Sequence, residues 1–312
     1  MHRMDEVKVY APASIGNIGP GFDVLGLAVS GMGDVVRAAL QDKPVIEIVS
    51  IKNDGGRLPL ISEENTVSIA AKKVLDAAAC EKGLTLVIEK GVPFPSGLGS
   101  SAAGAVAGGF AANRLLGDPL AQDELLHLCT EAEAAVSGAY FADNTAAALL
   151  GGGVVTRHVD GRCEATPLGG IPDAAIVLAT PDFPMPTKES RNVLPKTVSM
   201  ENFVYNMGAA AAVTAAICRR DTQLLGRSID DRIVEPARAK LIPGFPEVKK
   251  AALDAGALGC SISGGGPTLF AIVRSGGPVD AVGDAMKKAF KDAELNSSIH
   301  ICGMDIKGAR QL

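Results

Sequence analysis

The segment PFPSGLGSSAAGAVAGG, residues 93–109, constrains the fold more than any other part of this sequence. Gly97 and Gly99 allow a left-handed turn, and the alanine-rich run after Ser100 favours a helix. A tight turn that leads into a helix directs the unpaired N–H groups of the first helical turn, and the positive end of the helix dipole, toward one point. The segment therefore predicts a phosphate-binding site, with the serine hydroxyls as further donors or magnesium ligands.

Two other phosphate-binding motifs do not fit this segment. A Walker A loop needs Lys directly after its last glycine, where this chain has Ser100. The string GLGSSA matches the dinucleotide pattern GxGxxA, but that fold also needs an acidic residue at the end of a second strand about 20 residues later. Asp118 instead precedes Pro119 in a turn. The remaining alternative is a glycine-alanine helix packed tightly against a sheet, without a ligand.

The order of the predicted elements indicates an α+β protein of two domains. A chain of 312 residues is longer than a single hydrophobic core usually supports. The stretch HVDGRCEATPLGGIPD, residues 158–173, is polar and has no periodicity, so the domains are expected to span residues 1–165 and 166–312. Strands are expected at Val7–Ala11, Val35–Leu40, Val45–Ile51, Leu84–Lys90, Val154–Arg157, Ile176–Thr180, Cys260–Ser263, Thr268–Val273 and Ser298–Cys302. Helices are expected at Asn65–Cys80, Asp123–Val136, Asn144–Leu150, Thr197–Arg219, Pro246–Ala255 and Val279–Phe290, besides the one that begins near Ser100.

Charge and hydropathy argue against nucleic-acid and membrane partners. The net charge is −5, and basic pairs such as Lys72-Lys73 and Arg219-Arg220 are scattered over helical segments instead of forming one basic face. The most apolar stretches, Met207 to Cys218 and Ala146 to Val155, are too short to span a bilayer, and the first residues lack the apolar core of a signal peptide. A cytoplasmic location is expected.

Two further glycine-rich turns accompany the central segment: PASIGNIGPGFDVLG at residues 12–26 and GCSISGGGPTLFAIV at residues 259–273. In order and spacing, the three motifs resemble those of the GHMP (galactose, homoserine, mevalonate, phosphomevalonate) kinases, and PxxxGLGSSAA is the most diagnostic. The resemblance covers essentially the whole chain. It implies a two-domain fold, with an N-terminal ribosomal protein S5 domain 2-like domain and a C-terminal ferredoxin-like α/β sandwich. It also implies phosphoryl transfer from ATP, with Mg²⁺, to a small alcohol.

The helix expected at Asp123–Val136 carries the candidate magnesium ligand. A helical wheel places Glu133 between Leu126 and Cys129 on the apolar stripe, whereas Glu131 lies on the polar face and is expected to be merely solvated. A carboxylate in an apolar stripe is costly unless a cation accompanies it. The resemblance also assigns Glu133 to magnesium, together with Ser101. The residues that it assigns to ATP are Asn65, Pro93, Pro95, Ser96, Gly97, Leu98, Gly99, Ser100, Ser101 and Ala102.

The segments PMPTKESRNVLP and DRIVEPARAKLIPGF resemble those of the homoserine kinases within the family. An amino-acid substrate needs arginine for its carboxylate and an acidic group for its ammonium. The resemblance implies that Arg191 and Arg238 hold the carboxylate of L-homoserine, while Asp23 is a plausible partner for the ammonium group. The substrate residues that it implies are Asn17, Asp23, Thr187, Arg191, Arg238, Gly264 and Gly265. The expected product is O-phospho-L-homoserine, an intermediate of threonine biosynthesis, and a homodimer is a candidate assembly.

The segment AYFADNTAAALLGG resembles the HxDN stretch of the family, which places Asp143 and Asn144 near the reacting hydroxyl, with Ser101 and Glu133 completing the catalytic group. Asp143 is a candidate for hydrogen bonding and is not assigned as a general base. Where homoserine kinases usually have His, this chain has Phe141. From the residues alone, Asp143-Asn144 is equally interpreted as a helix N-cap.

Three other functions are compatible with parts of the pattern. A family member that phosphorylates mevalonate, an isoprenoid precursor or a sugar is kept open by Phe141 and opposed by Arg191 with Arg238. A non-catalytic nucleotide-binding homologue would be expected to have a damaged magnesium site, but Ser101 and Glu133 are both present. A nicotinamide-dependent oxidoreductase is disfavoured, because this chain lacks the acidic residue that such an enzyme needs after its second strand.

Overall fold

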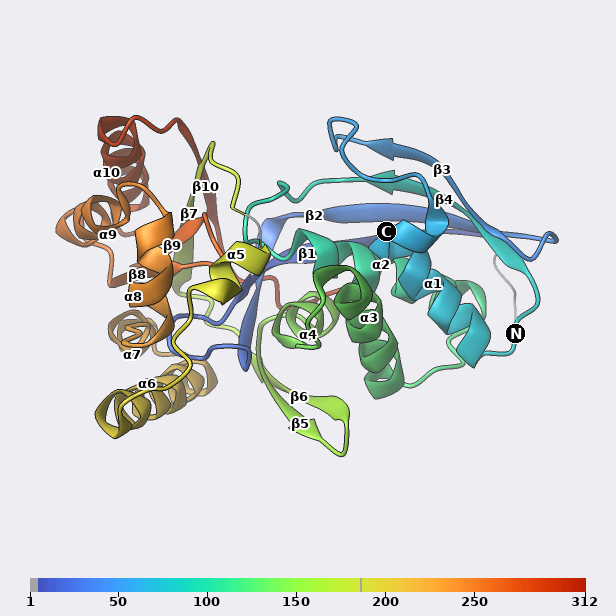
Figure 1. The fold of residues 1–312 in the computed structure, drawn as a ribbon, viewed down its shortest axis with the longest axis horizontal. Coiled ribbons are helices and arrows are strands. Elements are labelled where there is room, and N and C mark those ends of the chain that lie inside the picture. The colour runs from blue at the N-terminus through green and yellow to red at the C-terminus, as the bar shows by residue number, and fades with distance from the viewer. Residues whose placement is uncertain (1–4, 186) are drawn as a thin grey trace.

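The computed structural model describes residues 5–185 and 187–312, which fold into two halves that lie side by side (Figure 1). The N-terminal half is built on a seven-stranded sheet. Its main path runs β11-β1-β2-β4-β3, and β5 pairs with both β2 and β6. The strands are β1 (Glu6–Gly16), β2 (Leu25–Gln41), β3 (Ile46–Lys52), β4 (Gly83–Glu89), β5 (Gly153–Val159), β6 (Arg162–Gly169) and β11 (Arg310–Gln311).

Helices α1 (Thr66–Ala77), α2 (Ser100–Leu115), α3 (Gln122–Ser137) and α4 (Asp143–Leu150) pack on this sheet, and the short η1 (Ser62–Glu64) precedes α1. The glycine-alanine composition of α2 lets it lie close to its neighbours. A Cβ atom at Gly108 would lie 2.2 Å from the carbonyl oxygen of Val67 in α1. A Cβ atom at Gly109 would lie 2.6 Å from the Sγ atom of Cys129 in α3. Close packing is therefore one role of the α2 sequence.

The C-terminal half is a four-stranded antiparallel sheet in the order β10-β7-β9-β8. Its strands are β7 (Ala174–Pro181), β8 (Gly259–Ile262), β9 (Leu269–Arg274) and β10 (Ser297–Cys302). Its helices are α5 (Thr187–Asn192), α6 (Met200–Arg219), α7 (Thr222–Ser228), α8 (Val234–Arg238), η2 (Ala239–Leu241), α9 (Phe245–Asp254) and α10 (Val279–Asp292). Numbered within this half, the strand order is 4-1-3-2, which confirms the predicted ferredoxin-like sandwich.

Alternation along the C-terminal strands divides the core into two layers. Val177 and Ala271 face α9 and α10, whereas Ile176 and Phe270 face the other side, where α6 and α7 lie. The second layer also contains Ile15 of β1, so one continuous apolar cluster joins the two halves of the molecule.

The three glycine-rich turns of the sequence meet where the two halves join. The Ser263 hydroxyl donates a hydrogen bond to the carbonyl of Gly97 at 2.8 Å, and the N–H of Gly264 donates to the carbonyl of Gly16 at 3.1 Å. Gly97 has a φ of 79°, and a Cβ atom there would lie 2.6 Å from the carbonyl oxygens of Ser263 and Gly266. The turns therefore contact one another through main chain.

Most expected elements are present, but β1 extends to Gly16 and β2 begins at Leu25, well beyond the expected Val7–Ala11 and Val35–Leu40. The expectation that residues 158–173 are irregular was wrong in part. This stretch contains β6, which pairs with β5 as an antiparallel hairpin in the N-terminal sheet. Periodicity failed here because several neighbouring side chains of β6 are exposed and only Cys163 is buried. The division at residues 165 and 166 falls within β6 and stays a prediction.

In the part of the chain that the structure describes, no helix combines the length and the apolar character that crossing a bilayer requires.

The contact between the glycine turns predicts that Gly97→Ala strongly lowers the free energy of unfolding. Gly161 serves as a matched control, because its φ is 78° and, within the described structure, no atom lies within 4 Å of a Cβ atom placed there. Gly161→Ala is expected to cost about 1 kcal/mol from its left-handed backbone alone. Gly97→Ala is expected to cost about 2 kcal/mol more, because two carbonyl oxygens must move. Urea unfolding of both variants measures the difference, and equal losses would contradict this packing.

Candidate active site

The turn before α2 has the conformation that its glycines predicted. Gly97 and Gly99 have φ angles of 79° and 65°, Gly99 is the N-cap of α2, and the helix begins at Ser100. A Cβ atom at Gly99 would lie 2.1 Å from the Oγ atom of Ser14, so the turn backs directly onto β1. The first N–H groups of a helix have no partner within it. The turn thus presents hydrogen-bond donors and the positive end of the helix dipole at one place. A ligand can bind there only if a cavity lies beside the turn.

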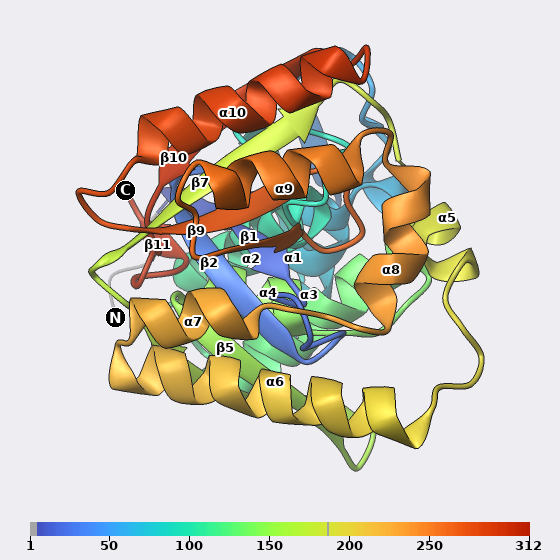
Figure 2. The same cartoon turned by 90° about the vertical axis from the view of Figure 1, so that its left-hand side faces the viewer.

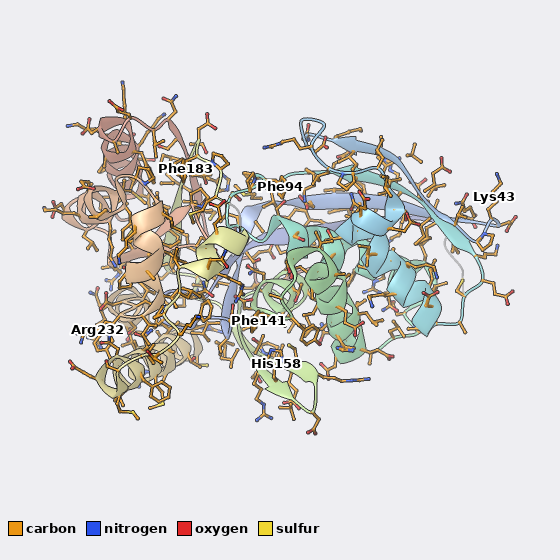
Figure 3. The ribbon with its side chains drawn as sticks, viewed as in Figure 1. Lys43, Phe94, Phe141, His158, Phe183 and Arg232 are labelled. Atoms are coloured by element: carbon orange, nitrogen blue, oxygen red, sulfur yellow. The ribbon has the colours of Figure 1, made fainter. Side chains whose placement is uncertain are left out.

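Two adjoining hollows provide room beside this helix terminus. One, of 200 Å³, is lined by Asn65, Ser100, Ser101 and Val136, among others. The other, of 610 Å³, is lined by Pro93, Phe94 and Pro95 on one side and by residues 180–184 and 296–298 of the C-terminal half on the other. Phe94 and Phe183, which both line the larger hollow, lie near the junction of the two halves in Figure 3. Arg57, Leu58, Lys90 and Phe94 line both hollows.

The residues assigned to the nucleotide divide into those that line the hollows and those that support the turn. Asn65 caps α1, because its Oδ1 accepts from the N–H of Val67 at 3.0 Å while its Nδ2 donates to Pro59 at 3.0 Å. Ser96 is buried and donates to the carbonyl of Pro93 at 2.7 Å. Leu98 is fully buried. Ser96 and Leu98 therefore hold the turn from behind.

The two serines at the start of α2 differ in their hydrogen bonding. The Ser100 hydroxyl donates to the carbonyl of Val92 at 3.4 Å. The Ser101 Oγ atom is buried and has no hydrogen-bond partner in the described part of the chain. Buried hydroxyl groups are normally paired, so a lone one at a helix terminus beside a hollow indicates a missing ligand. Ser101 is therefore the better candidate for a metal or phosphate contact.

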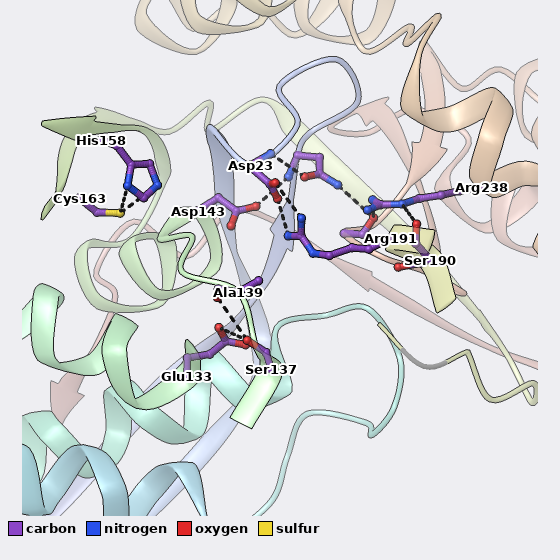
Figure 4. A network of polar contacts seen from close by, with 12 residues as sticks. Asp23, Glu133, Ser137, Ala139, Asp143, His158, Cys163, Ser190, Arg191 and Arg238 are labelled. Atoms are coloured by element: carbon purple, nitrogen blue, oxygen red, sulfur yellow. Dashed lines mark hydrogen bonds and ion pairs between the residues drawn. The ribbon is translucent and has the colours of Figure 1, made fainter. Parts of the chain in front are cut away.

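Glu133, in α3, lines a third and smaller cavity of 80 Å³. Val136, one turn later in the same helix, lines the 200 Å³ hollow together with Ser101. Ser137 donates a hydrogen bond to the Glu133 carboxylate at 3.0 Å (Figure 4). Burial, with a smaller contribution from the charge of Asp143, raises the pKa of Glu133 to about 7. A cation beside Glu133 would stabilise the charged form of its carboxylate.

The expectation that Glu131 is merely solvated was wrong. Its carboxylate pairs with Lys73 at 2.8 Å and lies 3.3 Å from the Nε2 atom of His127. The hydrogen bond from Lys73 lowers the pKa of Glu131. Glu131 does not line the three cavities described above, which leaves Glu133 as the carboxylate of α3 at the site.

The donor set fits magnesium better than a metal with an all-protein cage. The described residues contain no group of three or more His, Cys, Asp or Glu side chains that could hold a metal ion together. Mg²⁺ is usually bound by one or two protein ligands, with water and phosphate oxygens completing its shell. The orphaned Ser101 hydroxyl and the Glu133 carboxylate match that pattern.

This 80 Å³ cavity brings together most of the residues assigned to the substrate. It is lined by Asn17, Asp23, Glu133, Ser137, Ala139, Phe141, Asp143, Asn144, Thr145, Arg191, Arg238, Gly264 and Gly265. The side chain of Thr187, the remaining assigned residue, lies outside the described part of the chain, although α5 begins at Thr187. The cavity lies against both halves, because Asp143 comes from α4 and Arg238 from α8.

Arg191 and Asp23, assigned to opposite ends of the substrate, bind each other in this structure. Two hydrogen bonds of 2.8 and 3.0 Å join the guanidinium to the carboxylate (Figure 4). Arg238 is buried and donates to the carbonyls of Gly264 at 2.7 Å and Ser190 at 3.1 Å. Burial, with the nearby charge of Arg191, lowers the pKa of Arg238 to about 10.

Aromatic rings flank these arginines. The Arg191 guanidinium carbon lies 4.5 Å from the ring centre of Phe141 and 5.5 Å from that of Phe22. The Arg238 guanidinium carbon lies 5.2 Å from the Phe22 ring centre. A cation over an aromatic face gains about 0.5–2 kcal/mol, depending on its exposure. Phe141 thus contacts the substrate cavity by supporting Arg191 and not by hydrogen bonding.

Asp143 and Asn144 are held by β1 and the turn that follows it. The N–H of Asn17 donates to Asp143 at 3.3 Å, and the Ser14 hydroxyl donates to the Asn144 amide oxygen at 3.0 Å. Burial, followed by the charge of Asp23, raises the pKa of Asp143 to about 6. The N-cap interpretation was wrong, because α4 begins at Asp143, its N-cap is Ala142, and no side chain caps it in the described structure.

Lys90 and Asp34 are two residues of this site that sequence reasoning missed. They form a buried ion pair, and Lys90 also donates to the carbonyl of Ser100 at 3.0 Å. Asp34 accepts the N–H groups of Gly91 at 3.0 Å and Val92 at 3.1 Å. A signal existed in the sequence: Lys90 has the parity of the buried residues Leu84, Leu86 and Ile88, which places its side chain on the inner face.

Comparisons with known proteins show the family to which the chain belongs. The family description "GHMP kinases N terminal domain" matches residues 65–152, and "GHMP kinases C terminal" matches residues 213–292. The chain is 39% identical to the homoserine kinase of Chloroherpeton thalassium, over 99% of this chain and 100% of that protein. It is 42% identical to the homoserine kinase of Arabidopsis thaliana, over 97% of this chain and 84% of that protein.

Solved structures match over the whole chain as well. The crystal structure of homoserine kinase from Cytophaga hutchinsonii superposes with a TM-score of 0.94 at 42% identity, covering 100% of this chain and 99% of that one. The galactokinase of Lactococcus lactis, solved with galactose, matches with a TM-score of 0.73 at 18% identity, covering 99% of this chain and 96% of that one. At that identity the likeness concerns the fold alone.

The buried ion pair below the turn predicts a strong stability effect. Lys90→Met leaves the Asp34 carboxylate buried without its cation and is expected to cost about 3 kcal/mol or more. Lys73→Met removes the more exposed pair with Glu131 and is expected to cost at most about 1 kcal/mol. Adding Asp34→Asn to Lys90→Met should restore much of the loss, because no unpaired charge remains buried. Urea unfolding tests all three variants, and similar losses for Lys90→Met and Lys73→Met would refute this assignment.

Proposed function

The chain belongs to the GHMP kinase family, and we propose that it is a homoserine kinase. It transfers the γ-phosphoryl group of ATP to the hydroxyl of L-homoserine and forms O-phospho-L-homoserine for threonine biosynthesis. The observation that carries the substrate assignment is the pairing of Arg191 with Asp23, beside Arg238, in a small cavity next to the start of α2. A cavity that places two guanidinium groups beside the Asp23 carboxylate suits a small zwitterion better than a sugar or a polyol.

The Arg191–Asp23 pair explains how the substrate binds without leaving a charge uncompensated. Homoserine brings one carboxylate and one ammonium group. When it enters, its carboxylate takes Arg191 and Arg238 while its ammonium group takes Asp23, so one ion pair is replaced by two. Each of these partly buried charges keeps a partner in both states, which avoids the penalty of an unpaired charge. Asn17, Gly264 and Gly265 form the remaining wall of this cavity, and Thr187 stays an assigned contact.

The nucleotide is assigned to the two hollows beside α2. The N–H groups at the start of the helix hold its phosphates, and Asn65, Pro93 and Pro95 line the space beside them. Ser101 and Glu133 would hold Mg²⁺, which, when bound, offsets phosphate charge during transfer. Lys90 orders the turn through the carbonyl of Ser100. The γ-phosphoryl group would then lie at the border between the hollows and the substrate cavity, where Glu133 lies.

Catalysis in this arrangement relies on position and charge. Asp143 is fixed by the N–H of Asn17 and lines the substrate cavity, so it can accept a hydrogen bond from the reacting hydroxyl. With a pKa of about 6 it is mainly a carboxylate at neutral pH. Asn144, held by Ser14, orients the same region. In-line transfer needs mainly alignment of the hydroxyl with the phosphorus, and we assign no strong general base.

The cytoplasmic location and the lack of nucleic-acid and membrane partners remain predictions.

The two glutamates of α3 give a matched test of the magnesium assignment. Glu133→Gln is expected to lower kcat by about 100-fold or more, because a carboxylate that compensates charge at the phosphates is lost. Glu131→Gln should keep a nearly normal kcat, since Glu131 pairs with Lys73 and His127 and lines none of the three cavities. ADP release measured over a range of Mg²⁺ concentrations distinguishes the variants. A normal rate for Glu133→Gln, or an equal defect in Glu131→Gln, would show that the wrong carboxylate was chosen.

A panel of acceptors tests the substrate assignment. ADP release is measured with L-homoserine, with 3-aminopropan-1-ol, which lacks only its carboxylate, and with 4-hydroxybutanoate, which lacks only its ammonium group. Each analogue is expected to lose about 100-fold or more in kcat/KM, because one buried charge of the Arg191–Asp23 pair stays unsatisfied. Mevalonate, galactose and water are run alongside. Preference for mevalonate or galactose would overturn the assignment, and no turnover with any acceptor would favour a non-catalytic nucleotide-binding protein.

A further inference from the structure

Arg191 comes from a short helix and must change partners when the substrate binds. Helix α5 has six residues and lies at the edge of the molecule, where an extended segment joins it to α6 (Figure 2). Both Nη atoms of Arg191 bind Asp23, and its buried Nε atom has no hydrogen-bond partner in the described part of the chain. Once the substrate carboxylate replaces Asp23, the direction of the guanidinium depends on the aromatic rings that flank it.

Phe141 supplies the nearer of these rings and comes from the loop between α3 and α4, residues 138–142. Its ring centre lies 4.5 Å from the guanidinium carbon of Arg191, compared with 5.5 Å for Phe22. The loop begins at Gly138, which has a φ of 77°. A Cβ atom at Gly138 would meet no atom of the described chain within 4 Å, so close main-chain packing does not hold this end of the loop. Side-chain contacts must therefore place the Phe141 ring.

The β5–β6 hairpin and α3 make those contacts. The ring centre of His158, in β5, lies 5.9 Å from that of Phe141 and 5.5 Å from that of Tyr140, at interplanar angles of 86° and 62°. Both pairs have the edge-to-face geometry that aromatic rings favour. On its other side, the Tyr140 hydroxyl forms a 2.6 Å hydrogen bond with Nδ1 of His127. His158 lies next to Phe141 in Figure 3 and beside Cys163, 3.5 Å from its Sγ atom, in Figure 4.

We propose, on the basis of the homoserine kinase function proposed above, that His158 is a positioning residue for the substrate carboxylate. Its ring holds Phe141 against Arg191, so the guanidinium keeps its direction when Asp23 gives way to the substrate. His158 lines none of the three cavities and therefore acts through Phe141. It is also exposed, so its replacement opens no cavity in the core.

Substitutions at His158 separate the ring contact from the polar contact. His158→Ala is expected to raise the KM for L-homoserine about 10-fold and to change kcat less than about threefold, because the carboxylate is held alike before and during transfer. His158→Phe should keep a nearly normal KM, since a flat ring still packs on Phe141 although the contact with Cys163 is lost. His158→Gln, which is polar and has no ring, should behave like His158→Ala. Arg157→Ala is the matched control, because Arg157 is exposed, pairs with Glu164 and points to the other face of β5.

An acceptor without a carboxylate distinguishes positioning from a general effect on the site. With 3-aminopropan-1-ol, kcat/KM should be the same for the wild type and for His158→Ala, because this acceptor has no group for Arg191 to bind. An equal loss with both acceptors would overturn the proposal, as would an unchanged KM for L-homoserine in His158→Ala. A KM for His158→Phe as high as that of His158→Ala would contradict the ring contact.

The direction of Arg191 can also be followed without turnover, in the ¹⁵N-labelled protein. The ring current of Phe141 shifts the Nε–H resonance of Arg191, which is identified by its absence in Arg191→Lys. His158→Ala should move this resonance toward its position in Phe141→Leu, and Arg157→Ala should leave it in place. If the wild type does not phosphorylate L-homoserine, the proposed function fails, and this shift still decides whether His158 positions Arg191. A resonance that His158→Ala leaves in place would overturn that role.

Discussion

The site depends on one constraint, which is that main chain must approach main chain where the two halves of the molecule meet. The turn before α2 is clamped between β1, which leaves no space for a Cβ atom at Gly99, and the β8–β9 turn, which leaves none at Gly97. Below it, the buried Lys90–Asp34 pair holds the strand ends that enter the turn. These contacts aim the first N–H groups of α2 at the hollows beside it and fix the distance to the substrate cavity.

The arginine side chains of the substrate cavity are paired with a carboxylate or with main-chain carbonyls. Arg191, Asp23 and Arg238 come from three distant segments, and in the structure Arg191 pairs with Asp23 while Arg238 donates to two carbonyls. The paired state is electrically balanced and can exchange partners with a zwitterion. Phe141 and Phe22 support the guanidinium groups from their faces. Phe141 thus contributes to the cavity through the contact of its ring with the Arg191 guanidinium and not through a hydrogen bond.

Periodicity and glycine patterns predicted much of this structure. The start of α2 at Ser100 and the helix that carries Glu133 followed from local sequence, whereas the ferredoxin-like sandwich of the C-terminal half was implied by the family resemblance. Strand β6 was missed because most of its side chains are exposed and it lacks alternation. The pairing of Arg191 with Asp23 was beyond local reasoning, since 168 residues separate them. Lys90 could have been found from strand parity, whereas the ion pair of Glu131 with Lys73 depends on how α1 and α3 pack.

The central claim is that the N–H groups of Ser100, Ser101 and Ala102 hold the phosphates of the nucleotide. The most direct measurement is a titration of the ¹⁵N-labelled protein with a non-hydrolysable magnesium-ATP analogue, followed through its amide resonances. The account predicts that these three amides show the largest shifts and that all three give one dissociation constant, while the amide of Gly161, in the turn between β5 and β6 and outside the lining of all three cavities, moves little. Binding of the analogue with unchanged resonances at Ser100, Ser101 and Ala102 would contradict it.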